Sequence, residues 1–357
     1  MLIIPGPMYH GPTTTTSTYR PQYCDNGWRF YLISLCLAVP LIWHCSVLHL
    51  YYKFTTLIGI LTLCGLLLTV AVYLKGIMAP DRHGGEHDPS GNPLFDLYCG
   101  VELFPNLGLL QRKVSLKVLI NTRVSLLLWQ LIVLAAWKAN YELSGGQLCW
   151  QMDTVTVLSM AYLIKAALWE EGYMHTFDCE RFGFIFTFGC LAIVPSLYTL
   201  PNSFLVENCR RPDGVLTRSV AILALVLGIG GLVLSYLTDT QRTAVRAADG
   251  RCTVWGRPPR LIRAKYRSEK GEERPSLLLA SGFWGQARHM NYLFEAVTNL
   301  AMALPTLSCL PFALFAVVLG ILLHRTTRDD EKCARKYGKY WQQYKELVPY
   351  RMVPGVF

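Results

Sequence analysis

The last part of the chain, from His324 to Phe357, mixes basic and aromatic side chains directly after an apolar run. Its charged residues include Arg325, Arg328, Asp329 and Lys336, and its aromatic residues include Tyr337, Tyr340, Trp341, Tyr344 and Tyr350. Aromatic rings can stack on a nucleotide base, and the guanidinium fork of arginine matches the geometry of phosphate. The alternatives are a solvated basic tail and an amphipathic stretch on a membrane surface.

A second basic segment, from Thr238 to Pro275, repeats this theme. Arg242 and Arg246 lie four positions apart, so a helix places them on one face. Two guanidinium groups on one face could clamp a phosphate group, and the alternative is a pair of surface charges near lipid headgroups. The glycines do not form a GxGxxG pattern after a strand, so a Rossmann nucleotide site is not supported.

Ionisable side chains also gather where an apolar run ends, in LWEEGYMHTFD. These residues are Glu170, Glu171, His175 and Asp178. Ionisable groups at membrane depth are costly and are candidates for function. The alternative is that the helix ends here and the acids face water. Asn121 and Arg123, inside the run from Leu116 to Trp137, are either functional or placed at a helix end where they reach the interface.

The chain that carries these residues has the composition of a membrane protein. The chain has 357 residues, 52% hydrophobic and 16% charged, with mean hydropathy +0.29, whereas soluble domains carry about 25% charged residues. Apolar runs lie at about 29–51, 54–76, 116–137, 150–169, 183–206, 217–237, 280–304 and 306–323. A membrane helix needs roughly 20 such residues, and these runs lack the alternation of a β-barrel. We expect an all-α, polytopic integral membrane bundle of about eight spans.

The distribution of charge predicts the orientation of this bundle. The net charge is +10, and the basic residues gather in the segments 238–275 and 324–357. Positive segments favour the cytoplasmic face, and a hairpin formed by the last two runs places both segments there. We read the charge as a signal of topology and expect no nucleic-acid partner. We expect one membrane domain over 29–357, after a polar N-terminal segment at 1–28.

The twelve cysteines contain no CxxC pair, and most lie in apolar runs, as Cys36, Cys64, Cys190 and Cys309 do. We therefore expect buried free thiols, with neither a disulfide framework nor a metal site. The N-terminus lacks the basic start and apolar core of a signal peptide.

Long motifs in this sequence resemble those of one enzyme family. The motifs are GNPLFDLYCGVELFPNLG, LKVLINTRVSLLLW, YTLPNSFLV, GFWGQARHMNY and HRTTRDDEKCARKYGKYWQQYKELVPYR, in that order over roughly residues 91–357. They resemble the membrane-bound sterol reductases, which include the sterol C14 reductases and the 7-dehydrocholesterol reductases. The segments ADGRCTVWGRPPRLI, GFWG and VPYRMVPGVF are similar to the 7-dehydrocholesterol reductase branch.

This resemblance implies an endoplasmic-reticulum membrane enzyme of about ten helices, so about two helices of the family pattern are expected to be missing here. It implies NADPH from the cytoplasm as the hydride donor and a sterol from the surrounding membrane lipids as the acceptor. By position, the NADPH contacts would be Arg242, Arg246, Trp284, Arg288, His289, Asn291, Arg325 and Tyr337. The proton-donor region would be Tyr173 and Asp329, with Glu171 nearby. Of these we rank Tyr173 as the donor and Asp329 as its partner.

The activity implied is that of an oxidoreductase acting on CH–CH groups in sterol and cholesterol biosynthesis. It would reduce the C7–C8 double bond of a Δ5,7 sterol, as in the conversion of 7-dehydrocholesterol to cholesterol. The alkene is protonated first, and hydride transfer follows. The alternatives are a sterol Δ14 reductase and a truncated, non-catalytic sterol-binding relative. The ending KYGKYWQQYKELVPY also resembles isoprenylcysteine-type methyltransferases, but the upstream motifs argue against that class.

The sequence departs from the family pattern at several positions. Leu94 and Phe95 stand where the family has an aromatic pair, and FPNLG lacks the arginine of NPRxG. The stretch HTFDCERFG is about two residues shorter than its counterpart, and the second aspartate of the family pattern is either absent or replaced by Glu180.

Overall fold

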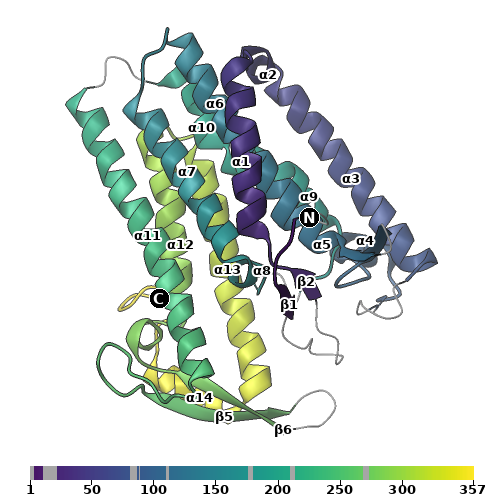
Figure 1. The fold of residues 1–357 in the computed structure, drawn as a ribbon. Helices are drawn as coiled ribbons and strands as arrows, with labels where there is room; N and C mark the ends of the chain where they lie inside the picture. The colour runs from purple at the N-terminus through teal and green to yellow at the C-terminus, as the bar shows by residue number, and fades with distance from the viewer. Residues whose placement is uncertain are drawn as a thin grey trace. The chain divides into compact units, whose positions relative to one another are not determined.

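The computed structural model describes residues 4–10, 22–80, 87, 89–109, 112–175, 180–209, 214–267 and 273–357. Its internal contacts divide the chain into two compact units, Met1–Arg218 and Ser219–Phe357. This division falls inside the segment predicted as one domain, and the boundary after residue 28 stays a prediction. The elements of each unit can be followed by colour in Figure 1.

The first unit is built mainly from helices that coincide with the apolar runs. Its helices are α1 (Gly27–His44), α2 (Leu48–Tyr52), α3 (Phe54–Met78), α4 (Pro93–Cys99), α5 (Leu116–Val118), α6 (Leu126–Leu143), α7 (Trp150–Leu168), α8 (Glu170–His175), α9 (Phe184–Phe188) and α10 (Leu200–Asn208). Two π-helical stretches, η1 (Leu119–Ser125) and η2 (Gly189–Tyr198), pack against each other. Pro195 lies inside η2 and has no backbone N–H to donate there.

Small side chains bring the central helices of this unit together. Ala135, Ala136 and Ala139 on α6 are buried in one cluster with Met152 of α7 and Leu205 of α10. Alanines at a helix interface let the backbones approach closely, which is the usual way for helices to pack in a membrane. The outer helix α3 instead exposes many leucines, as expected for a surface that faces lipid.

Five helical stretches among the described residues are long and apolar enough to cross a membrane. They are Gly27–His44, Phe54–Met78, Leu116–Leu143, Phe184–Asn208 and Val215–Ala247. The predicted polytopic α-helical membrane fold is therefore confirmed, while the count of about eight spans stays a prediction.

The second unit carries the basic segment and the tail. Its elements are α11 (Val215–Ala247, which begins in the last residues of the first unit), β5 (Leu261–Arg267), β6 (Glu273–Leu279), η3 (Gly282–Gly285), α12 (Met290–Ala303), η4 (Leu304–Thr306), α13 (Phe312–Tyr337) and α14 (Lys339–Leu347). α12 and α13 pack against each other, which confirms the predicted hairpin. Leu307, in the short link between them, has a left-handed backbone conformation.

Short β-hairpins accompany the helices and were not predicted. Antiparallel pairs form between β1 (Met8–His10) and β2 (Gln22–Cys24), between β3 (Asn106–Leu109) and β4 (Arg112–Ser115), and between β5 and β6. In the basic segment, Ala264 of β5 and Leu278 of β6 are buried with Trp341 and Tyr344 of α14. The tail thus packs on the basic hairpin through its aromatic rings and is not a freely solvated tail.

Two predictions about the cysteines are wrong. Cys149 and Cys209 form a disulfide, 60 positions apart in the sequence. They meet because α7 begins and α10 ends beside the same end of α6, where the Asn140 side chain donates to the carbonyls of Leu205 and Val206. A spacing of this length gives no sequence signature. The other described cysteines are free, but the expectation that they are buried is also wrong for most of those named, because Cys190 is buried whereas Cys36, Cys64 and Cys309 are exposed.

Candidate active site

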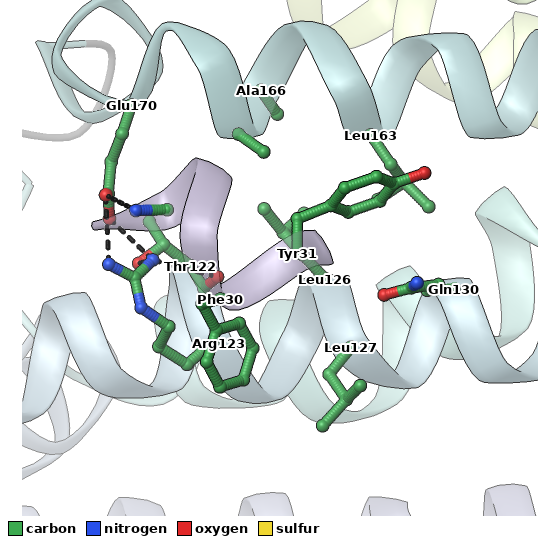
Figure 2. A pocket seen from close by; sticks show the side chains of 12 residues that line it. Phe30, Tyr31, Thr122, Arg123, Leu126, Leu127, Gln130, Leu163, Ala166 and Glu170 are labelled. Atoms are coloured by element: carbon green, nitrogen blue, oxygen red, sulfur yellow. Dashed lines mark hydrogen bonds and ion pairs between the residues drawn. The ribbon is translucent and has the colours of Figure 1, made fainter. Parts of the chain in front are cut away.

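The acids at the end of α7 belong to a buried ion-pair network. Glu170 is 1% exposed, and its carboxylate accepts hydrogen bonds from both terminal nitrogens of Arg123, at 2.7 and 2.9 Å. The backbone N–H of Gly27 donates to the same carboxylate at 2.9 Å, and Arg123 also donates to Asn26 at 2.7 Å. Figure 2 shows this pair from close by. For Glu170, the alternative that the acid faces water is therefore wrong, and the Arg123 side chain is buried inside the protein.

A small cavity lies beside this pair, between α1, α6 and α7. Figure 2 shows Arg123 and Glu170 at one end of it and Tyr31 and Gln130 at the other. Its volume is about 20 Å³, which is enough for an ordered water and far too little for a sterol. Within the described part of the chain, the Tyr31 hydroxyl and Gln130 Nε2 have no hydrogen-bond partner. A water between these groups would satisfy them.

The two neighbouring predicted residues of α8 are also held by hydrogen bonds. Glu171 accepts from the hydroxyl of Tyr9 in β1 at 2.9 Å, so the N-terminal hairpin contacts α8. The Tyr173 hydroxyl donates to Asn121 Oδ1 at 3.2 Å. Asn121 lies in η1, within the same π-helical stretch as Arg123. Asp178 and the side chain of His175 lie outside the described residues.

In the second unit, Asp239 binds two residues predicted to contact the cofactor, and a third packs on one of these two. Arg242 forms an ion pair with Asp239 at 3.1 Å, and its guanidinium group stacks 4.2 Å from the centre of the Trp284 ring. Asn291 donates to the same carboxylate at 3.2 Å. Since the Asn291 nitrogen is used in this way, its Oδ1 atom remains as an acceptor, and it is buried without a partner among the described residues.

Beside this group, His289 and Arg325 meet at Tyr292. The His289 and Tyr292 rings stack with their centres 5.1 Å apart, and the Arg325 guanidinium lies 5.9 Å from the Tyr292 ring. The Tyr292 hydroxyl donates to Asp329 at 2.7 Å. The buried Nε2 of His289 has no partner in the described structure.

Arg288 has contacts of a different kind. Its guanidinium group binds Asp330 at 3.1 and 3.3 Å and donates to the carbonyls of Val348 and Pro349, both at 2.8 Å. These bonds attach the C-terminal segment to the start of α12. Arg288 is thus engaged with protein groups, and its predicted contact with the cofactor stays a prediction.

The last two predicted contacts both bind strand β6 of the β5–β6 hairpin. Arg246 Nε donates to the Leu277 carbonyl at 3.3 Å, and the Tyr337 hydroxyl lies 3.3 Å from Ser276 Oγ. Arg242 and Arg246 share one face of α11, as expected from their spacing. Every predicted cofactor residue therefore lies in the second unit. Of the proposed proton-donor residues, Tyr173 and Glu171 lie in the first unit and Asp329 in the second.

Sequence reasoning missed the residues that organise this unit. Asp239 binds Arg242 and Asn291. Tyr292 binds Asp329, and Asp330 binds Arg288. A signal was available for Asp239, because an acid three positions before an arginine on a helix can pair with it. No comparable spacing relates Asp330 to Arg288, which precedes it by 42 positions.

Comparison with known proteins places the chain in a family. The family described as "Ergosterol biosynthesis ERG4/ERG24 family" matches residues 1–357. The chain belongs to this family. It is 35% identical to the 7-dehydrocholesterol reductase of Arabidopsis thaliana over 362 residues, with 100% of this chain and 81% of the relative covered. It is 31% identical to the Delta(14)-sterol reductase of Methylotuvimicrobium alcaliphilum, with 99% of this chain and 79% of the relative covered.

A vertebrate relative matches over a shorter length. The chain is 34% identical to the 7-dehydrocholesterol reductase of Xenopus laevis, with 75% of this chain and 56% of the relative covered. The predicted membership of the sterol reductase family is therefore confirmed, and with it an oxidoreductase of sterol biosynthesis in a multi-pass membrane protein. The relatives include reductases of both branches, so family membership does not decide between the C7 and C14 double bonds.

Replacing Arg288 with Ala is expected to destabilise the second unit by about 3 kcal/mol, because the change leaves Asp330 and two carbonyls without their buried partner. The measurement is the thermal unfolding midpoint of the detergent-solubilised protein. Arg351→Ala is the matched control, since Arg351 lies 3.7 Å from the same carboxylate but its side chain is 37% exposed. The control should cost less than about 1 kcal/mol. Equal effects would show that burial of Arg288 is not what holds the C-terminal segment.

Proposed function

We propose that this chain is an NADPH-dependent sterol Δ7 reductase of the endoplasmic-reticulum membrane. It would take a Δ5,7 sterol from the bilayer and reduce its C7–C8 double bond with NADPH from the cytoplasm. The observation that carries the cofactor part is the group formed by Arg242, Trp284 and Asn291 around Asp239. The choice of Δ7 rests on the segment 248–262, which resembles the 7-dehydrocholesterol reductase branch. A Δ14 reductase is the second candidate, because a reductase of that name is 31% identical over 99% of this chain.

The residues of the second unit fit NADPH. Arg242 and Arg246 offer two guanidinium groups for its phosphates, with the 2′-phosphate as the group that distinguishes NADP from NAD. Asn291 Oδ1 and His289 Nε2 are buried polar atoms without partners among the described residues, and such atoms need a ligand or water to satisfy them. The flat rings of Trp284 and of the His289–Tyr292 stack offer surfaces for the planar parts of the cofactor.

When bound, NADPH would supply the hydride, and the protein would have to supply the proton. An isolated alkene does not accept hydride until protonation of one carbon makes its neighbour electrophilic. A phenol such as Tyr173 carries its proton at neutral pH, and Asn121 Oδ1 accepts this hydroxyl proton in the structure. Asn121 therefore fixes the direction of the Tyr173 O–H bond. We keep Tyr173 as the proposed donor, with Glu171 beside it on α8.

Asp329 accepts a hydrogen bond from the Tyr292 hydroxyl. In this proposal Asp329 acts as an acceptor that orients a partner group, and it does not itself donate the proton. A cation formed on the sterol also requires that water be excluded, and lateral entry between membrane helices would provide a dry site.

The substrate assignment is tested in microsomes that contain the expressed protein and NADPH. We expect mass spectrometry to show reduction of 7-dehydrocholesterol and little reduction of a Δ8,14 sterol. Reduction of the Δ14 substrate alone would contradict the branch assignment. Sterol binding without NADPH binding would leave only the non-catalytic alternative.

Arg325→Ala should raise the KM for NADPH about tenfold and change the KM for sterol little, since loss of one desolvated charge contact costs about 1.4 kcal/mol or more. Arg257→Ala is the control, because Arg257 is exposed in the turn before β5. An equal rise in both KM values would argue against a cofactor role for Arg325.

Tyr173→Phe removes only the hydroxyl group and should lower kcat by about 100-fold or more, the usual effect of losing a general acid. NADPH affinity should stay unchanged. Tyr98→Phe is a matched control, because Tyr98 also lies in the first unit and is 52% exposed. A Tyr173→Phe enzyme with nearly the original kcat would exclude Tyr173 as the proton donor.

A further inference from the structure

The disulfide between Cys149 and Cys209 marks one end of the first unit. Cys149 immediately precedes α7 and is 1% exposed, and Cys209 immediately follows α10. Their Cα atoms lie 6.7 Å apart, within the usual range for a disulfide. The cross-link therefore joins two helix ends that are already packed on α6.

Aromatic side chains surround this end. Trp43 near the end of α1 contacts Tyr141 near the end of α6, with ring centres 6.0 Å apart. Trp150 is 46% exposed and directly follows Cys149. Exposed tryptophans and tyrosines at the ends of membrane helices are typical of the membrane–water interface. The disulfide thus lies at a helix end that meets water, not in the middle of the bilayer.

The chain path relates this end to the basic segment. α11 begins at Val215, six positions after Cys209. Six residues reach at most about 20 Å, which is less than the roughly 30 Å of a hydrocarbon core. The start of α11 is therefore on the same side of the membrane as the disulfide.

α11 then carries the chain across the membrane. Its 33 residues extend about 50 Å, more than the hydrocarbon core requires, and its composition is that of a membrane span. Its far end holds Arg242 and Arg246 and leads into the basic segment 238–275, which the positive-inside rule assigns to the cytoplasm. The two ends of α11 must then lie on opposite sides.

We propose that the Cys149–Cys209 disulfide faces the lumen of the compartment, where it forms by oxidation. Two thiols lose two protons and two electrons in this step, and a disulfide of the lumen accepts them and becomes two thiols. Two independent features agree on this orientation. Stable disulfides are typical of oxidising compartments, and the charge of the opposite end of α11 is typical of the cytoplasmic side. The proposal does not depend on which sterol the enzyme reduces.

Thiol labelling tests whether the bond exists in the membrane. Membranes that contain the full chain are dissolved in denaturant with N-ethylmaleimide, which blocks the free thiols. The disulfide is then reduced, and the thiols that it releases are labelled with maleimide-polyethylene glycol. The original protein should gain two polymer chains more than Cys149→Ser, because that variant leaves Cys209 free and blocked in the first step. Cys252→Ser is the control and should behave as the original protein does, since Cys252 is free. An equal shift for the original protein and Cys149→Ser would overturn the proposal.

Glycosylation tests which side the bond faces. A flexible insert of about 20 residues with one Asn-Ser-Thr acceptor is placed between Gly145 and Gly146, both exposed in the loop before Cys149, where insertions are tolerated. The same insert after Phe357 is the control. We expect a glycosidase-sensitive increase in mass only for the loop insert, because glycans are added in the lumen. A glycan at the C-terminal insert, or none at the loop insert, would overturn the orientation.

Discussion

The buried ion pair between Arg123 and Glu170 is the interaction on which the first unit depends most. Transfer of two charges out of water costs several kcal/mol for each ion, and the cost is repaid only when the remaining polar atoms also find partners. Here Asn26 and the Gly27 N–H supply two of these partners, while Arg123 Nε has none among the described residues. The pair therefore fixes the start of α1, the π-helical stretch η1 and α8 relative to one another. Tyr173 and its acceptor Asn121 lie in two of these elements, so the proposed donor inherits its position from the ion pair.

The second unit uses carboxylates in the same way. Asp239 positions Arg242 and Asn291, and Asp330 positions Arg288. Paired cations keep their positions when no ligand is bound, which reduces the ordering that a ligand must impose. Arg288 and Arg242 differ in the contacts that their guanidinium groups make. Arg288 has its nitrogens committed to protein oxygens, whereas Arg242 has one ion pair and a flat ring beside it, so Arg242 is the better suited of the two to meet a phosphate.

Sequence alone predicted the parts of this structure that depend on local composition. The apolar runs predicted the membrane helices, and the last two runs predicted the α12–α13 hairpin. Contacts between distant residues could not be predicted, because they depend on how the helices pack. Arg123 and Glu170 are 47 positions apart and Cys149 and Cys209 are 60 apart. The strands β5 and β6 were missed because their buried positions are few and lie among many arginines, so the segment appears uniformly basic.

The similarity of the two reactions explains why sequence identity to relatives does not distinguish a Δ7 from a Δ14 reductase. C7 and C14 of a sterol are both bonded to C8, so Δ7 and Δ14 reduction act on neighbouring parts of one skeleton. In the proposed mechanism, both reactions need a hydride donor and an acid near the same ring system. Discrimination then depends on where the acid stands relative to the bound sterol, because a displacement of about 1 Å is enough to change the rate greatly. A few residues around Tyr173, the proposed donor, could set that distance while the residues proposed to bind NADPH stay the same.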